Sequence, residues 1–185
     1  MEIMLRCSVP DRPGALGELT GAIGRFGGDI QAVEVVETED GRALDDLVIV
    51  VEPEGLTRLM DGVRGLPDVE VVHVGPSRGH PGDAVTRLAL GLQSLLDGAM
   101  TEENGVSALV GGLLRADSVD LVPAREAPRG NARTLVLPFD DRALVVRRVY
   151  RFTDTERERT EALVRVTLQA ARFRRATGAA GVATG

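Results

Sequence analysis

The residues best suited to bind a small molecule lie in one short stretch, VPDRPGALGEL, at residues 9–19. Within it, Asp11, Arg12, Pro13 and Gly14 separate an apolar strand-like run from a helix-like pattern. Pro13 presets the first turn of that helix without losing a needed hydrogen bond. Because Gly14 has no side chain, a ligand or a neighbouring subunit can approach the backbone there closely. Exposed amides at the helix start favour an anion such as a carboxylate.

Two acidic residues can add to this chemistry. Asp11 can cap the amides at the helix start, or it can accept hydrogen bonds from the ammonium group of a ligand. Asp29 begins the next strand-like run after two glycines. We expect Asp29 at the same end of the sheet as the turn at residues 11–14, where it can face the same ligand.

Residue types that usually carry catalysis or bind metal are scarce. The chain has one cysteine, Cys7, and two histidines, His73 and His80, and it has no lysine. Their spacing matches no structural or catalytic metal motif, and no serine lies in a G-x-S-x-G elbow. The acidic run at 37–46 lacks the ligand spacing of an EF-hand, so we expect a solvated hairpin there. These observations predict no catalytic residues, no bound metal, no cofactor and therefore no enzyme.

The elements that must position the turn follow the order βαββαβ over about 75 residues. Leu16, Leu19, Ile23 and Phe26 recur at spacings of three and four, which predicts a helix. The sequence EDG at 39–41 is a tight-turn signal between two β-rich runs. The predicted elements are strands at 4–9, 29–38, 43–52 and 69–74 and helices at 15–26 and 56–66.

This order resembles the ACT domain family, as do residues 11–14 (DRPG) at the first turn and residues 27–30 (GGDI) entering the second strand. The resemblance implies a ferredoxin-like α+β fold that regulates an attached or partner enzyme, often by binding an amino acid. In the family the ligand commonly sits between the first turn of one subunit and the second-strand entry of its neighbour. Carried over, it implies a site formed by Asp11, Arg12, Pro13, Gly14, Ala15, Leu16, Asp29 and Ile30. Family members often have Asn at the two Asp positions, and a carboxylate can only accept hydrogen bonds.

A domain boundary is expected at residues 77–83, within the linker-like sequence GPSRGHPGD. Residues 1–76 hold 6 Arg and 15 Asp and Glu, a net charge of −9, whereas residues 77–185 hold 16 Arg and 13 Asp and Glu, a net charge of +3. We expect an ACT-like domain at 1–76, a second α+β domain at 84–175 and a disordered tail at 176–185.

The second domain is predicted to contain helices at 84–97 and near 106–114, strands at 118–122, 134–139 and 143–150, and a final helix. The final helix begins with a capping box, TDTE, at 153–156. Phe152, Thr153 and Glu156 resemble the closing segment of the GAF domain family. This resemblance implies a small, truncated GAF-like α+β domain that dimerises through its terminal helices. The basic RRVYR at 147–151 is either a phosphate patch or a solvated strand edge guarded by Arg.

Composition narrows the class of partner. The acidic N-terminal half disfavours nucleic acid, and the aromatic content of 3% disfavours readers of single strands, which stack bases on aromatic rings. No apolar run reaches the length of a membrane span, and no secretory signal is visible. With a single cysteine, we expect a cytoplasmic protein in a reducing compartment.

Two functions remain open. The first is a non-catalytic regulatory or sensor protein that binds an amino acid or related small metabolite at an ACT dimer interface and relays this to a partner protein. The alternative is a structural interaction or dimerisation module without a ligand. Both predict a homodimer, no nucleic acid and no membrane. A small enzyme ranks third, because no base and nucleophile can be named.

Overall fold

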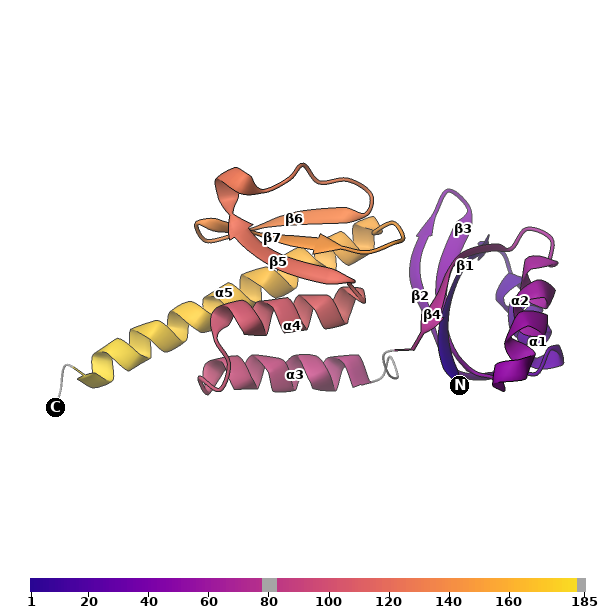
Figure 1. Ribbon diagram of the computed structural model, residues 1–185, viewed down its shortest axis with the longest axis horizontal. Helices are drawn as coiled ribbons and strands as arrows, with labels where there is room; N and C mark the ends of the chain where they lie inside the picture. Colours follow the sequence, from indigo (N-terminus) through magenta and orange to yellow (C-terminus); the bar gives the residue numbers. More distant parts are fainter. Residues whose placement is uncertain (78–82, 183–185) are drawn as a thin grey trace. The chain divides into compact units, whose positions relative to one another are not determined.

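A computed structural model describes residues 1–77 and 83–182 of the chain (Figure 1). The chain forms two compact units, Met1–Pro81 and Gly82–Gly185. The division between them falls inside residues 77–83, the segment that we expect to link two domains. Residues 78–82 of that segment, and residues 183–185 at the end of the chain, lie outside the described part.

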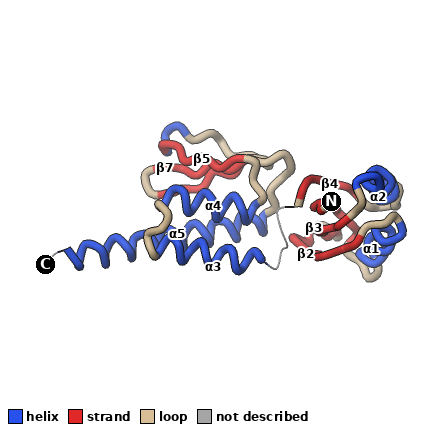
Figure 2. Tube along the Cα trace, turned by 60° about the horizontal axis from the view of Figure 1, so that its bottom comes forward, coloured by secondary structure: helices blue, strands red, loops and turns tan. Residues whose placement is uncertain are grey.

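The first unit is an antiparallel sheet with two helices on one face. Its elements are β1 (Glu2–Pro10), α1 (Ala15–Arg25), β2 (Asp29–Glu39), β3 (Arg42–Val50), the short 3₁₀ helix η1 (Pro53–Gly55), α2 (Leu56–Arg64) and β4 (Glu70–Pro76). The strands lie in the order β2-β3-β1-β4, and every neighbouring pair is antiparallel. Both helices cover the same face of the sheet (Figures 1 and 2). This is the ferredoxin-like arrangement predicted from the sequence.

One face of the sheet and the two helices enclose the core of this unit. Side chains alternate between the two faces along a strand, so every second residue of β1 and β3 points to the helices. Burial of each large apolar side chain stabilises the fold by about 1.5–3 kcal/mol. The fully enclosed members include Leu5, Cys7, Leu19, Ile23, Leu47, Ile49, Leu59 and Val63.

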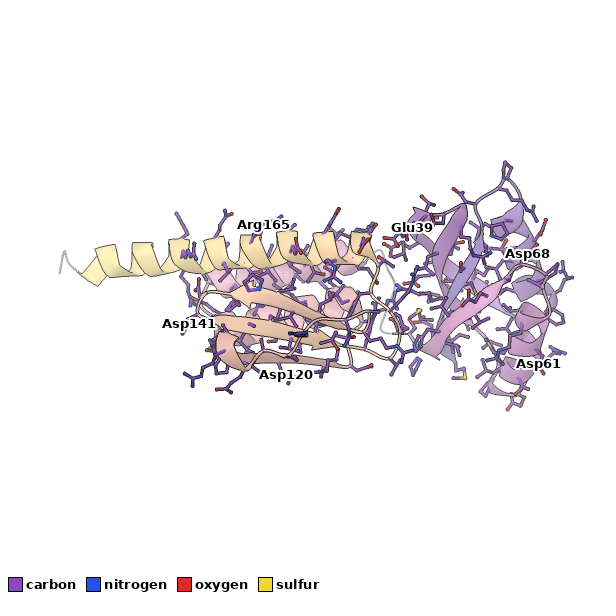
Figure 3. All side chains as sticks on the ribbon, turned by 90° about the horizontal axis from the view of Figure 1, so that it is seen from above. Glu39, Asp61, Asp68, Asp120, Asp141 and Arg165 are labelled. Carbon is purple, nitrogen blue, oxygen red and sulfur yellow. The ribbon has the colours of Figure 1, made fainter. Side chains whose placement is uncertain are left out.

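The hairpin between β2 and β3 is fastened to the rest of the unit. Asp40 and Gly41 have φ values of 50° and 71°, the left-handed pair that a two-residue type I′ turn requires. Arg42 donates from Nε to Ser8 Oγ at 2.7 Å and from Nη2 to the carbonyls of Ser8 at 2.8 Å and Asp68 at 3.0 Å. Asp68 follows α2 (Figure 3), so these bonds tie the hairpin to β1 and to the loop before β4.

The second unit is a three-stranded antiparallel sheet packed on helices. Its elements are α3 (Asp83–Leu96), α4 (Glu102–Leu114), β5 (Ser118–Pro123), the 3₁₀ helix η2 (Ala124–Glu126), β6 (Thr134–Phe139), β7 (Arg142–Arg147) and α5 (Asp154–Val182). The strand order is β5-β7-β6, and α4 and α5 lie against one face of the sheet (Figure 1). Their shared core includes Leu95, Val106, Val110, Leu114, Leu135, Leu144, Val146 and Leu163.

The start of α5 carries the predicted capping box. The Thr153 amide donates to Glu156 Oε2 at 2.9 Å, and the Glu156 amide donates to Thr153 Oγ1 at 3.0 Å. Arg148, which we expected on a phosphate patch or a solvated edge, is instead buried. It donates to Glu156 Oε1 at 2.8 Å and lies between the rings of Tyr150 and Phe152, 4.1 and 4.0 Å from their centroids. This ion pair fastens the end of the sheet to the start of α5.

Two predictions for the second unit differ from the structure. The strand expected at 143–150 ends at Arg147, because the next residue turns inward to reach Glu156. The helix α5 continues to Val182 and includes residues 176–182, where we expected disorder. In the described part of the chain, no helix is both long enough and apolar enough to cross a membrane.

Candidate functional site

The turn at residues 11–14, hereafter the 11–14 turn, leaves its backbone uncovered. Gly14 is the N-cap of α1 with a φ of 91°, and no side chain caps this helix start. A Cβ atom added to Gly14 would meet no described atom within 4 Å. The left-handed φ favours glycine, since other residues are strained there. The turn therefore offers open space above a backbone that only glycine adopts without strain.

Two backbone donors at the start of α1 are free. The Ala15 amide donates to the carbonyl of Arg12 at 3.2 Å, and the Glu18 amide donates to Gly14 at 2.9 Å. The amides between them, on Leu16 and Gly17, have no acceptor within the described residues. Unsatisfied amides at a helix N-terminus carry partial positive charge and favour an anion.

The flanking side chains leave this start open. The N-cap of α1 has no side-chain cap, and no hydrogen bond from Asp11 to the amides of this helix start is present in the described residues, so the other predicted role of Asp11, accepting from a ligand, stays a prediction. Its backbone amide donates to the carbonyl of Gly41 at 2.8 Å and so fastens the turn to the β2–β3 hairpin. Arg12 pairs with Glu18 at 3.2 Å on the exposed surface. Pro13 is exposed as well.

Below the turn, Ala15 is buried and Leu16 packs against the core. These two residues therefore hold α1 in place, and they contribute backbone more than side chain to the open surface. The structure brings together six of the eight predicted site residues, those at positions 11–16, around the first turn of α1.

The other two predicted residues lie elsewhere in the same chain, and the expectation for Asp29 is wrong. Asp29 pairs with Val50, which also pairs with Glu2 at the start of β1, whereas Pro10 pairs with Arg42 at the opposite end. Eight steps along a strand separate the two ends by about 26 Å. The reason is that α1 returns the chain to the end of the sheet where β1 begins.

Asp29 and Ile30 differ in their surroundings. Asp29 is exposed, and its carboxylate accepts from the side-chain amide of Gln31 at 2.7 Å. Ile30 is half-buried and packs against the core. Within one chain, neither residue can reach a ligand held at the 11–14 turn.

Sequence reasoning missed an acidic residue beside this site. Asp45 and Asp46 belong to the run expected to be a solvated hairpin, yet only 1% and 3% of their surfaces are exposed. Asp46 pairs with Arg6 on the far face of the sheet, at 2.6 and 2.8 Å. Asp45 points to the helices, and its Oδ1 has no hydrogen-bond partner in the described structure. Adjacent acids inside an apolar strand were the available signal, since alternation must turn one of them inward.

Asp45 is electrostatically linked to the turn. Burial raises the pKa of the Asp45 carboxyl above its usual value, and the nearby carboxylates of Asp46 and Asp11 raise it further. Cys7 is paired with Asp45 across β1 and β3. Burial, together with the nearby carboxylates of Asp45 and Asp46, raises the pKa of the Cys7 thiol to about 12. Cys7 therefore stays protonated and unreactive at neutral pH.

No metal centre emerges from the described residues: they contain no group of three or more His, Cys, Asp and Glu side chains arranged to hold an ion. His73 lies on β4, half-buried, and pairs with Arg6 of β1. His80 lies outside the described part of the chain.

The second unit has an open cavity of about 610 Å³ near the start of α4 and the β6–β7 turn. Both arginines that line it face a glutamate of α4: Arg142 pairs with Glu103, and Arg174 lies 3.9 Å from Glu102. The first of these pairs lowers the pKa of the Glu103 carboxyl. Because these charges are matched, the 11–14 turn is the better candidate site.

Comparison with known proteins relates most of the first unit to one family. Residues 3–66 match the family model of the ACT domain. The chain resembles the ACT domain of GTP pyrophosphokinase from Chlorobium tepidum, with 26% identity, a TM-score of 0.33, and coverage of 43% of this chain and 89% of that one. It also resembles the ligand-free regulatory subunit of aspartate kinase from Thermus thermophilus, with 11% identity, a TM-score of 0.38, and coverage of 91% of each chain. A putative glycine cleavage system transcriptional repressor shows 11% identity, a TM-score of 0.38, and coverage of 88% and 89%. No curated protein matches the chain.

Proposed function

Because residues 3–66 form an ACT domain, we propose that this chain is a non-catalytic regulatory protein. It binds an amino acid or a related small metabolite at an interface between two copies and relays this binding to a partner protein. The observation that carries the proposal is the uncovered start of α1, where Gly14 leaves open space and the amides of Leu16 and Gly17 lack acceptors. The single cysteine is buried, in keeping with a cytoplasmic location.

The chemistry of the turn suits a zwitterion. The free amides of Leu16 and Gly17 can hold a carboxylate. The carboxylate of Asp11, which caps nothing, can accept hydrogen bonds from an ammonium group. An amino acid presents both groups at once, so it can use both halves of the turn.

A second copy completes this site. Two-fold pairing of edge strands β2 places the start of one β2 beside the end of the other, because the paired strands run antiparallel. That end of the sheet carries the 11–14 turn. Asp29 and Ile30 of one copy thus join the turn of the other, although one chain keeps them apart. Val33 and Val35 on β2 are 40% and 50% exposed, and such an edge favours pairing with another strand.

The second unit adds the means of association and relay. Its closing segment carries the Phe152, Thr153 and Glu156 pattern, on which we base a GAF-like identity for this unit. On α5, Val166 and Phe173 are 46% and 65% exposed. They stand seven residues apart, on one face of the helix. We assign to this face a contact between the terminal helices of two copies, and binding at the ACT domains then shifts the population of two states of the assembly.

The test is a thermal-shift screen of the full chain against the twenty amino acids, with light scattering for the oligomeric state. A bound amino acid at about 100 times its Kd stabilises the protein by about 2.7 kcal/mol, an increase in Tm on the order of 10 °C. A dimer that responds to none of the twenty contradicts the proposal and favours the interaction module without a ligand.

Gly14→Ala tests whether the response arises at the turn. The added methyl group enters the open space and strains a φ of 91°, so the amino-acid response should disappear. The control is Gly98→Ala, which places the same methyl group on another glycine of left-handed φ, 75°, in the second unit, where the nearest atom is the end of the flexible Arg174 side chain at 3.2 Å. The control should keep the response, and its loss in both variants would locate the effect in general stability.

A further inference from the structure

Asp45 is a buried acid, one of whose carboxylate oxygens has no hydrogen-bond partner among the described residues. Only 1% of its surface is exposed, and Oδ1 makes no hydrogen bond within the described residues. It stands in β3 between Ala43 and Leu47, and both of these belong to the apolar core under the helices. A buried polar group normally finds a hydrogen-bond partner, so this exception needs an explanation.

A buried carboxylate in this sheet can have hydrogen-bond partners within the protein. On the opposite face, the adjacent Asp46 receives two hydrogen bonds from the guanidinium of Arg6. In the described part of the chain, no donor reaches Oδ1 of Asp45. Leaving a buried polar group unsatisfied opposes folding, and residues held at such a cost cluster at functional sites. An unsatisfied acceptor that persists in the core therefore points to a partner that arrives from outside the chain.

The position of Asp45 connects it to the 11–14 turn. Both lie on the face of the sheet that α1 covers, and Asp11 is near enough to raise the pKa of Asp45. The turn is fastened through Asp11 to Gly41, four residues before Asp45 in the chain. One strand neighbour of Asp45 is the buried Cys7, and the other is Val35, half of whose surface is exposed on the edge strand β2. Of the two strands beside Asp45, only β2 is an edge strand of the sheet, so we expect a ligand to reach Asp45 from the β2 side.

We propose that Asp45 accepts the cationic nitrogen of the ligand whose carboxylate is held by the amides of Leu16 and Gly17. This inference rests on the proposed function of the same site and names the group that distinguishes its ligand from a plain carboxylic acid. A ligand ammonium can donate the hydrogen bond that Oδ1 of Asp45 lacks in the described structure, and it brings a positive charge to the carboxylate. Asp11, exposed at the mouth of the site, supports the same charge from outside.

The experiment compares the full-length chain with Asp45→Asn, which keeps the shape of the side chain and removes its charge. Each amino acid is paired with its analogue lacking one nitrogen: L-valine with isovalerate, L-phenylalanine with hydrocinnamate, and L-lysine with L-norleucine. The last pair separates a side-chain ammonium from an α-ammonium. Binding is measured by calorimetry, and Tm is measured without ligand.

Three results are expected together. Without ligand, Asp45→Asn raises Tm, because an unpaired buried charge is removed. It lowers the affinity for the amino acid that the wild-type chain binds by about 10- to 100-fold, the value of a hydrogen bond to a charged group. It leaves the weaker affinity for the analogue that lacks the recognised nitrogen unchanged. The control variant Asp46→Asn lowers Tm by breaking the pair with Arg6 and leaves the preference for the amino acid over its analogue intact.

The outcomes separate this inference from the function on which it rests. If no amino acid binds the wild-type chain, both are overturned. If an amino acid binds wild type and Asp45→Asn equally, the proposed function stands and the role of Asp45 is overturned. A drop in Tm for Asp45→Asn, or a weaker dimer without ligand, also overturns it, since Asp45 would then have a partner in the protein itself.

Discussion

The starts of α1 and α5 solve the same problem in opposite ways. Each helix begins after a strand and leaves amides that need acceptors. At α5, Thr153 and Glu156 bond each other's backbone, and the buried Arg148 closes the arrangement. At α1, Gly14 offers no side chain, and two amides stay free. The start of α2 at Gly55 also lacks a side-chain cap, but it follows the 3₁₀ helix η1 directly, whereas α1 begins at an open turn with two free amides and is therefore the start to examine for a ligand.

The largest expected loss of stability comes from breaking the ion pair between Arg148 and Glu156 at the start of α5. Glu156→Gln leaves the buried Arg148 guanidinium without its counter-charge, and breaking such a pair costs about 3–5 kcal/mol. The free energy of unfolding of the second unit, followed by denaturant titration, should fall by that amount. Glu158→Gln, two residues along on the exposed surface, is the control and should change stability by less than about 0.5 kcal/mol. Equal effects of the two variants would show that the Arg148–Glu156 pair does not hold this junction.

The next effect concerns pH and the acid beside the α1 start. The pKa of Asp45 is raised in the folded chain above its ordinary value of 3.8, so the folded state binds that proton more tightly than the unfolded state. Its contribution is complete below pH ~4 and declines as the pH rises through the folded pKa. Asp45→Asn should therefore gain stability relative to wild type as the pH rises towards neutrality, on the order of 1–3 kcal/mol. A difference independent of pH, in unfolding curves from pH ~3 to ~7, would contradict the burial of an ionised Asp45.

A smaller loss of stability is expected from removing one of the two hydrogen bonds of the capping box at the start of α5. Thr153→Ala deletes the oxygen that accepts from the Glu156 amide, and loss of such a cap costs about 1 kcal/mol. The Arg148–Glu156 pair remains, so the loss should be well below that of Glu156→Gln. Thermal unfolding of both variants gives the order, and a reversed order would mean that the cap outweighs the ion pair.

The smallest effect on stability is expected from making α1 resemble α5. Asn tolerates a left-handed φ better than other residues with a side chain, so Gly14→Asn should change the free energy of unfolding by less than about 1 kcal/mol. Its amide group enters the open space, so the response to amino acids should be lost. Retained binding with unchanged stability would show that the ligand, if any, lies elsewhere.

The sequence predicts the parts of this molecule that depend on local pattern. Periodicity and turn residues locate the four strands and two α-helices of the first unit, and the turn signal at residues 39–41 corresponds to the left-handed pair Asp40 and Gly41. The capping box at residues 153–156 follows from spacing alone. Such features depend on residues close in the chain, and their physics is contained in a short window.

Features that depend on distant parts of the chain were missed. The end of the sheet at which Asp29 lies depends on the path of α1 between two strands. The burial of Asp45 and Arg148 depends on which face of a strand other elements cover. A run of acids or arginines is therefore misjudged as solvated when one member turns inward and the next does not.

The fastening of the hairpin by Arg42 has a consequence for recognition. Its three hydrogen bonds join β1, β3 and the loop before β4, and Gly41 in turn anchors the backbone of Asp11. Because these bonds fix the backbone beneath the first turn of α1, we expect the binding of a small molecule there to require little further ordering of the chain. A molecule with only a handful of polar atoms can then be recognised, since nearly all of its interaction energy goes into holding it.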